Sequence, residues 1–300
     1  MDNFVGVLES FSLIFSSIIL EALPFILIGA LVSAFMQTFL NNEMIERVTP
    51  NNKLLGGVAA ALLGLIFPVC ECATVPIARG LIRKGVPLNI ALAYMLAAPI
   101  INPVVLMSTY YAFNGSGKIV AYRALFGLLI AVVVGYLVDI LNGTESVLKN
   151  NSLFVNDSCS CGCSGYLNKK SKYLSILNHT SKELYEIGRF LIIGAAVASF
   201  FQVVIPRDKL LALGSNTVLS IWIMMMFAFL ISLCSEADAF IASTFLGSLN
   251  LGPVMAFLLL GPMVDVKNAA MLFSAFKKSF VVKLIFCIFS LCFIACCVII

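Results

Sequence analysis

Charged residues are scarce in this 300-residue chain, and their scarcity excludes a water-soluble protein. Only 11% of the residues are charged, 61% are hydrophobic, and the mean hydropathy is +1.05. A soluble domain carries about 25% charged residues. Too little charge remains to cover a surface that faces water. We therefore predict an all-α, polytopic protein whose helices lie in a lipid bilayer.

Signals of several other protein classes are also missing. The sequence holds no Walker-type loop for nucleotide phosphates, so we expect energy from an ion gradient or a partner, no enzyme activity and no cofactor. The net charge is only +4, and Lys and Arg gather at 79–84 and 169–189. That clustering is typical of cytoplasmic loops and not of a nucleic-acid surface. No basic segment precedes the apolar stretch that begins at Phe4, so no cleavable signal is expected.

Long apolar stretches dominate the sequence, and a span needs about 20 such residues. The eight candidates are 22–40, 54–78, 86–112, 119–141, 187–206, 217–241, 251–276 and 279–300. A polar segment divides them into two groups of four. The predicted organisation is a first transmembrane repeat at 1–141, a polar cytoplasmic loop at 142–180 and a second transmembrane repeat at 181–300.

The two halves carry the same polar and small residues in the same order. The matched pairs are Glu21 and Glu186, Phe25 and Phe190, Gly29 and Gly194, Cys70 and Cys234, Pro99 and Pro262, and Asn102 and Asp265. Such an order predicts two homologous four-span repeats, with both glutamates near an interface at a helix start. An even number of spans makes the repeats parallel. If residues 73–85 form a re-entrant or extra segment, the repeats are inverted instead.

Helix breaks are expected near the midplane of both repeats. Pro68 and Pro76 flank Cys70-Glu71-Cys72, and a proline removes an amide donor and clashes with the preceding turn. In the second copy, Ser235-Glu236-Ala237-Asp238 has the spacing of a capping box. Backbone groups freed at membrane depth need partners in protein or a water-lined cavity, and transporters place binding sites at such breaks.

Thiols and carboxylates gather at these breaks and predict the binding site. Cys70, Cys72 and Cys234 offer sulfur, which selects soft ions over Mg²⁺ or Ca²⁺, and trivalent arsenic shares that preference. Intramembrane carboxylates are costly and mark functional positions; those near the thiols are Glu71, Glu236 and Asp238. Glu236 and Asp238 could instead only cap a broken helix.

Asn102 and Asp265 form a second constellation, each three residues after a proline in a matched span. Both could line the same path or carry protons. Asp265 could instead pair with Lys267 or Lys278.

The polar loop contains Cys159, Cys161 and Cys163. In a reducing cytosol they would stay available for metal, although their spacing differs from that of a structural zinc site. We interpret them as an accessory capture site, or else as cysteines in a simple linker.

The motifs at 67–79, 97–105 and 232–240 together resemble a known family over nearly the whole chain. It is the predicted permease family that includes the ArsP organoarsenical efflux permeases. The resemblance implies an eight-span inner-membrane permease with a large central cytoplasmic loop. It also implies export of trivalent organoarsenicals by thiol ligands in some members, and a second membrane subunit in others.

The leading hypothesis is thus a multi-pass permease of the bacterial inner membrane that effluxes a soft metalloid or metal ion. Two alternatives stay open. A membrane thiol-disulfide oxidoreductase could use a disulfide between Cys70 and Cys234. A subunit that only shapes a two-component permease complex would leave the cysteines and acids without a role.

Overall fold

The computed structural model describes residues 2–39, 52–66, 69–143, 146–149, 169–204, 217–247 and 249–299. These residues are almost entirely helical, and the pairing between Leu148 and Phe276 is an isolated bridge that belongs to no sheet. The all-α class predicted from the sequence is confirmed.

The described helices form two series of similar order and length. The first is α1 (Asp2–Phe39), α3 (Lys53–Ile66), α4 (Glu71–Arg83), α5 (Leu88–Ile101), α6 (Pro103–Ala112) and α7 (Gly117–Asn142). The second is α8 (Lys169–Val204), α10 (Thr217–Ile231), α11 (Ser235–Phe245), α12 (Leu251–Met263), α13 (Val266–Ala275) and α14 (Lys278–Ile299). Each series contains one long helix followed by five shorter ones.

Six helical stretches of the described chain are long and apolar enough to cross a bilayer. Two more predicted spans, 54–78 and 217–241, consist of a short apolar helix (α3 or α10), an interruption, and a second short helix (α4 or α11). The helices establish a multi-pass membrane protein, while eight spans in two repeats stay a prediction.

The interruptions lie directly before Glu71 and Ser235. Cys70 and Cys234 are the residues that precede α4 and α11, with extended backbone and no side-chain cap. Pro76 lies inside α4 and does not end it. The capping box expected at Ser235 is wrong, because Ser235 is already the first residue of the helix.

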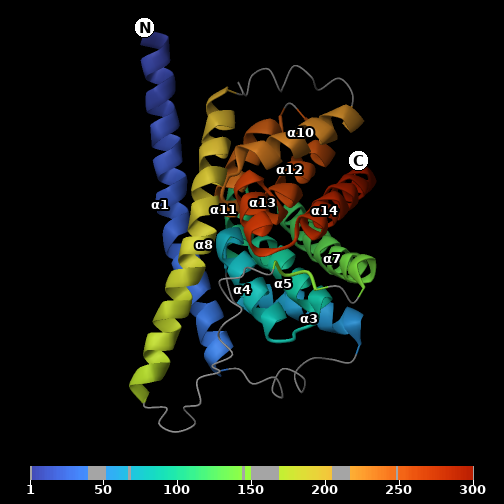
Figure 1. Cartoon of the computed structure of the whole chain (residues 1–300). Helices are drawn as coiled ribbons and strands as arrows, with labels where there is room; N and C mark the ends of the chain where they lie inside the picture. The colour runs from blue at the N-terminus through green and yellow to red at the C-terminus, as the bar shows by residue number, and fades with distance from the viewer. Residues whose placement is uncertain are drawn as a thin grey trace.

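The long helices α1 and α8 lie side by side along one flank of the bundle and run in opposite directions (Figure 1). Ile18 of α1 packs there against Ala195 and Ala198 of α8. The sequence pairs these two helices, so their antiparallel course differs from the parallel arrangement expected of an even number of spans. Residues 73–83, for which a re-entrant or extra segment was one of the alternatives, lie in α4, and that is the case in which inverted repeats were expected.

Helices α5 and α12 form the centre of the core and contact each other. Every residue of α12 from Gly252 to Met263 is buried, as are nearly all of those in α5. Helices α4 and α6 contact α5, and α11 contacts α12, so this buried pair supports the interrupted segments.

Candidate functional site

A small pocket lies where the two interrupted segments meet α1. Its cavity volume is about 10 Å³, roughly the space of one water molecule. The lining residues are Ile18, Glu21, Ala22, Phe25, Cys70, Glu71, Cys72, Cys234 and Lys267. Residues from both halves of the chain therefore line one pocket.

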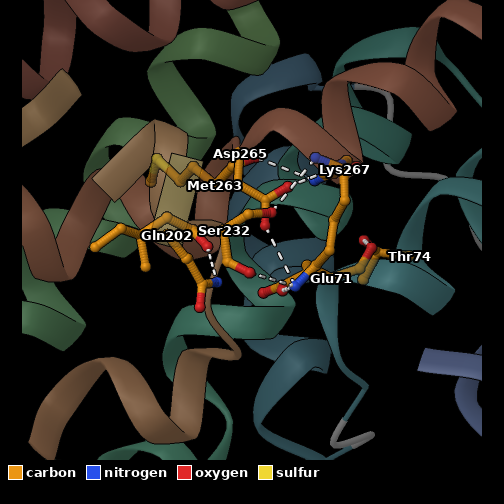
Figure 2. A network of polar contacts seen from close by, with 9 residues as sticks. Glu71, Thr74, Gln202, Ser232, Met263, Asp265 and Lys267 are labelled. Atoms are coloured by element: carbon orange, nitrogen blue, oxygen red, sulfur yellow. Dashed lines mark hydrogen bonds and ion pairs between the residues drawn. The ribbon is translucent and has the colours of Figure 1, made fainter. Parts of the chain in front are cut away.

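Lys267 is the charged centre of this site (Figure 2). Its Nζ lies 2.8 Å from Glu71 Oε1 and 3.4 Å from Asp265 Oδ2, and it donates a hydrogen bond of 3.2 Å to the Ser232 carbonyl oxygen. Ser232 has φ of +55°, a left-handed conformation that aims its carbonyl out of the α10 ladder. The interruption after α10 thus supplies an acceptor for the ammonium group.

Burial makes this network energetically significant. The side chains of Lys267 and Glu71 are only 6% and 1% exposed, and charges withdrawn from water persist only when they are paired and hydrogen-bonded. Glu71 begins α4 and Lys267 lies in the first turn of α13. The ion pair therefore ties the first half of the chain to the second.

The three thiols in the pocket are free. Cys70 interacts with Cys72 on the first turn of α4, and Cys234 interacts with Glu21 of α1. Cys70 and Cys72 are buried, whereas Cys234 is partly exposed. In the described part of the chain, no group of three His, Cys, Asp or Glu side chains is placed to hold a metal ion. The thiols share a wall of the pocket without converging on one point.

Of the other predicted site residues, only Asp265 joins the network. It caps α13 by accepting a 2.6 Å hydrogen bond from the Asn268 amide, and it pairs with Lys267, as one sequence interpretation expected. Asn102 caps α6, accepting a 3.0 Å bond from the Val104 amide. Glu236 and Asp238 of α11 do not line the pocket.

Asp238 lies in a separate polar cluster around Arg123, which is fully buried in α7. Arg123 donates hydrogen bonds of 2.7 Å to Thr109 Oγ1 and 3.1 Å to the Ser235 carbonyl oxygen. Asp238 Oδ2 is buried without a hydrogen-bond partner among the described residues, and Gly261 leaves room for it, since a Cβ there would lie 2.8 Å away. The cluster couples α6, α7 and α11.

A second buried ion pair links α4 to α8. Arg79 Nη1 lies 3.0 Å from Glu186 Oε2, with side-chain exposures of 1% and 8%. The expectation that Glu21 and Glu186 sit at a helix start is wrong, because both lie well inside continuous helices, and their place near an interface stays a prediction. Glu21 lines the pocket instead.

Cys159, Cys161 and Cys163 fall outside the described residues, so the accessory capture site stays a prediction.

Sequence reasoning missed Arg123, and it named Lys267 only as an alternative partner of Asp265. The signal was present, since a Lys or Arg inside an apolar span is costly and marks a functional or paired position. Glu71, which pairs with Lys267, and Ser235, which accepts a hydrogen bond from Arg123, come from the opposite half of the chain, so only the tertiary fold reveals these two contacts.

Comparisons with known proteins agree on one family. Residues 7–300 match the family model ArsP_1, described as a predicted permease. The chain is 44% identical over 272 residues to the UPF0718 protein YcgR of Bacillus subtilis (strain 168), covering 91% of this chain and 90% of that protein. It is 40% identical over 274 residues to a putative two-component membrane permease complex subunit of Streptococcus mutans, covering 91% and 89%. No solved structure matches.

Proposed function

The chain belongs to the predicted permease family ArsP_1, and from that premise we propose that it exports a soft, thiophilic solute across the bacterial inner membrane. The candidate solutes are a trivalent organoarsenical, arsenite or a soft metal ion. The observation that carries the proposal is the pocket lined by Cys70, Cys72 and Cys234, with thiols from both halves of the chain.

Sulfur chemistry suits such a pocket. A trivalent arsenic centre exchanges its hydroxide ligands for thiols, so that each new As–S bond replaces an As–O bond and the thiol proton leaves with the hydroxide as water. Soft metal ions are selected by thiolate in the same way. Since the thiols do not converge on a metal-binding geometry, binding requires Cys234 to move toward Cys70 and Cys72.

Carboxylates supply the remaining roles in this proposal. Glu71 and Asp265 hold the Lys267 ammonium next to the thiols. Asn102, Glu236 and Asp238 line other parts of the solute path in this proposal, because intramembrane polar groups are costly and mark functional positions.

The architecture in this proposal is two homologous halves, and the matched order of the helices supports it. Eight spans, four in each half, would make the halves parallel, whereas the opposite directions of α1 and α8 favour an inverted relation, which requires an odd number of crossings in each half and is common among transporters with discontinuous helices. A second membrane subunit is also proposed, because the Streptococcus mutans relative is named as a subunit of a two-component permease complex.

The test is growth of an exporter-deficient bacterium on trivalent methylarsenite, arsenite and a panel of soft metal ions. Cells expressing the native chain are compared with Cys70→Ser, Cys72→Ser and Cys234→Ser variants. Cys297→Ser is the matched control, because Cys297 is a free cysteine in α14 outside the pocket. The proposal predicts resistance with less cell-associated solute, retained by the control and lost by the three pocket variants.

Two results would redirect the assignment. Resistance that survives all three pocket substitutions would remove the thiols from the mechanism. No resistance to any compound, with membrane insertion verified, would favour the oxidoreductase, whose disulfide between Cys70 and Cys234 is then assayed directly, or a permease that works only with its partner.

A further inference from the structure

Matched glycines on α1 and α8 pack against helices that are not matched. At Gly29 a Cβ would lie 2.9 Å from the Ala73 Cα in α4, and at Gly194 it would lie 2.7 Å from the Lys267 Cα in α13. The proposed duplication pairs α4 with α11 and α13 with α6. A symmetric molecule would seat α1 and α8 on matched helices, so this structure departs from symmetry.

The burial of matched helices also departs from symmetry. Residues Glu71 to Gly80 of α4 are all buried, and most of α13 is buried as well. Their counterparts present apolar residues outward. On α6, Val104, Met107 and Tyr111 are 52%, 57% and 67% exposed, and on α11 Phe240 is 54% exposed. Helices α6 and α11 pack together, as α4 and α13 do, and their outer face lacks the cover that α1 and α8 give to α4 and α13.

We propose that the outer face of α6 and α11 is a second docking surface for α1 and α8. In transport, these two helices move together from α4 and α13 to α6 and α11, and the two positions are the two access states of the permease. The inference rests on the duplication within the proposed function. It assigns the moving element and the surface that receives it, whatever the solute.

Matched positions define the contacts of the second state. The offset that pairs Asn102 with Asp265 pairs Val104 with Lys267, and the offset that pairs Cys70 with Cys234 pairs Ala73 with Ala237. In the second state Gly29 therefore faces Val104, and Gly194 faces Ala237. Ala237 is as small as Ala73, so it accepts an equally close approach.

The ion pair between Arg79 and Glu186 holds the described state. Arg79 ties α4 to α8, and its matched position in α11 is Ser243, which would face Glu21 in the second state. Serine offers no cation there, so the second state lacks this charge pair. The movement also opens the pocket, because Ile18, Glu21, Ala22 and Phe25 of α1 form one of its walls.

The test is a distance measurement that needs no solute, so it succeeds or fails independently of the substrate assignment. Spin labels on genetically encoded p-acetylphenylalanine replace Ile28 of α1 and Tyr111 of α6, which are 53% and 67% exposed. The full chain is studied in lipid nanodiscs by pulsed electron paramagnetic resonance. This label leaves the ten cysteines in place.

Two independent variants should shift the distances. Ser243→Arg places a cation opposite Glu21 in the second state only, and Glu186→Gln removes the charge pair of the described state. Glu186→Gln should raise the ratio of short to long distances at least about tenfold, because breaking a buried charge pair strongly destabilises the state that holds it, and Ser243→Arg should shift the ratio in the same direction. Thr244→Arg and Tyr185→Phe are the matched controls, since both alter exposed neighbours, and they should leave the ratio unchanged.

One further variant tests the surface itself. Val104→Trp fills the docking site and should remove the short distances from the Ser243→Arg protein, whereas Leu125→Trp, at an equally exposed position of α7, should not. A single long distance in both Ser243→Arg and Glu186→Gln would overturn the proposal and leave the face to lipid or a partner subunit. Short distances that persist with Val104→Trp would equally overturn it.

Discussion

Removal of the Lys267 ammonium should destabilise the protein more than any other single charge change at the site. In the native protein the Lys267 ammonium lies 2.8 Å from Glu71 Oε1 and 3.4 Å from Asp265 Oδ2. Lys267→Met leaves both carboxylates buried without this shared cation. Breaking a buried ion pair costs about 3–5 kcal/mol. Because a buried carboxyl group can neutralise itself by taking a proton, we expect the lower part of that range.

Glu71→Gln should cost less. Lys267 keeps its contacts with Asp265 and with the Ser232 carbonyl oxygen, which lies 3.2 Å away. The free energy of unfolding should therefore fall by about the contribution of one hydrogen bond to a charged group, about 1.5–3 kcal/mol. In the double variant the charges of Lys267 and Glu71 disappear together, and only Asp265 is left without its cation. Its destabilisation should be smaller than the sum of the two single effects by about 0.5–3 kcal/mol, the range for contacting groups.

The assay is equilibrium unfolding of the purified protein in detergent or nanodiscs. Lys53→Met is the matched control, because Lys53 lies at the same 2.8 Å from Asp139 but its side chain is 63% exposed, and it should leave stability unchanged within error. Equal effects of Lys267→Met and Lys53→Met, or additive effects in the double variant, would refute the reasoning that burial makes this network significant.

Three further outcomes follow from local geometry. Gly194→Val should cost about 1–3 kcal/mol or more by forcing α8 away from α13, whereas Gly188→Ala, where nothing lies within 4 Å of the added Cβ, should be neutral in the same unfolding assay. Asn102→Ala should cost about 1 kcal/mol through loss of the α6 cap, and Asn102→Ser, which keeps a capping oxygen, should cost less. Lys53 donates a hydrogen bond to Asp139, and this raises the pKa of Lys53, so Asp139→Asn should lower that pKa in an NMR titration. Because Lys53 is exposed, the linked stabilisation, present below the unfolded-state pKa and lost as pH rises through the folded-state pKa, should lie within the error of the unfolding assay.

The sequence predicted the parts of the fold that follow from local composition. Apolar length predicted the membrane helices, and the prolines around Cys70 predicted an interrupted span, which the start of α4 at Glu71 confirms. The break in the second half was also predicted, because Cys234 matches Cys70, and α11 begins directly after it.

The remaining features of the site and the fold depend on contacts between distant segments, which the sequence alone does not show. Sequence spacing put Glu236 and Asp238 with the thiols, but the rotation of α11 after Cys234 turns Asp238 toward Gly261 and leaves Glu236 outside the pocket. Glu71 and Lys267 form an ion pair although they are 196 positions apart in the sequence, so sequence spacing alone could not indicate this contact. The directions of α1 and α8 likewise depended on whether α4 formed as an extra segment.

Transport by purified protein tests the central claim most directly. The full chain is reconstituted into proteoliposomes, and movement of trivalent methylarsenite and arsenite across the membrane is measured under imposed ion gradients. The account predicts flux that requires the native chain, is lost in Cys70→Ser, Cys72→Ser and Cys234→Ser, and persists in Cys297→Ser. Equal flux in the native protein and the three pocket variants would contradict it.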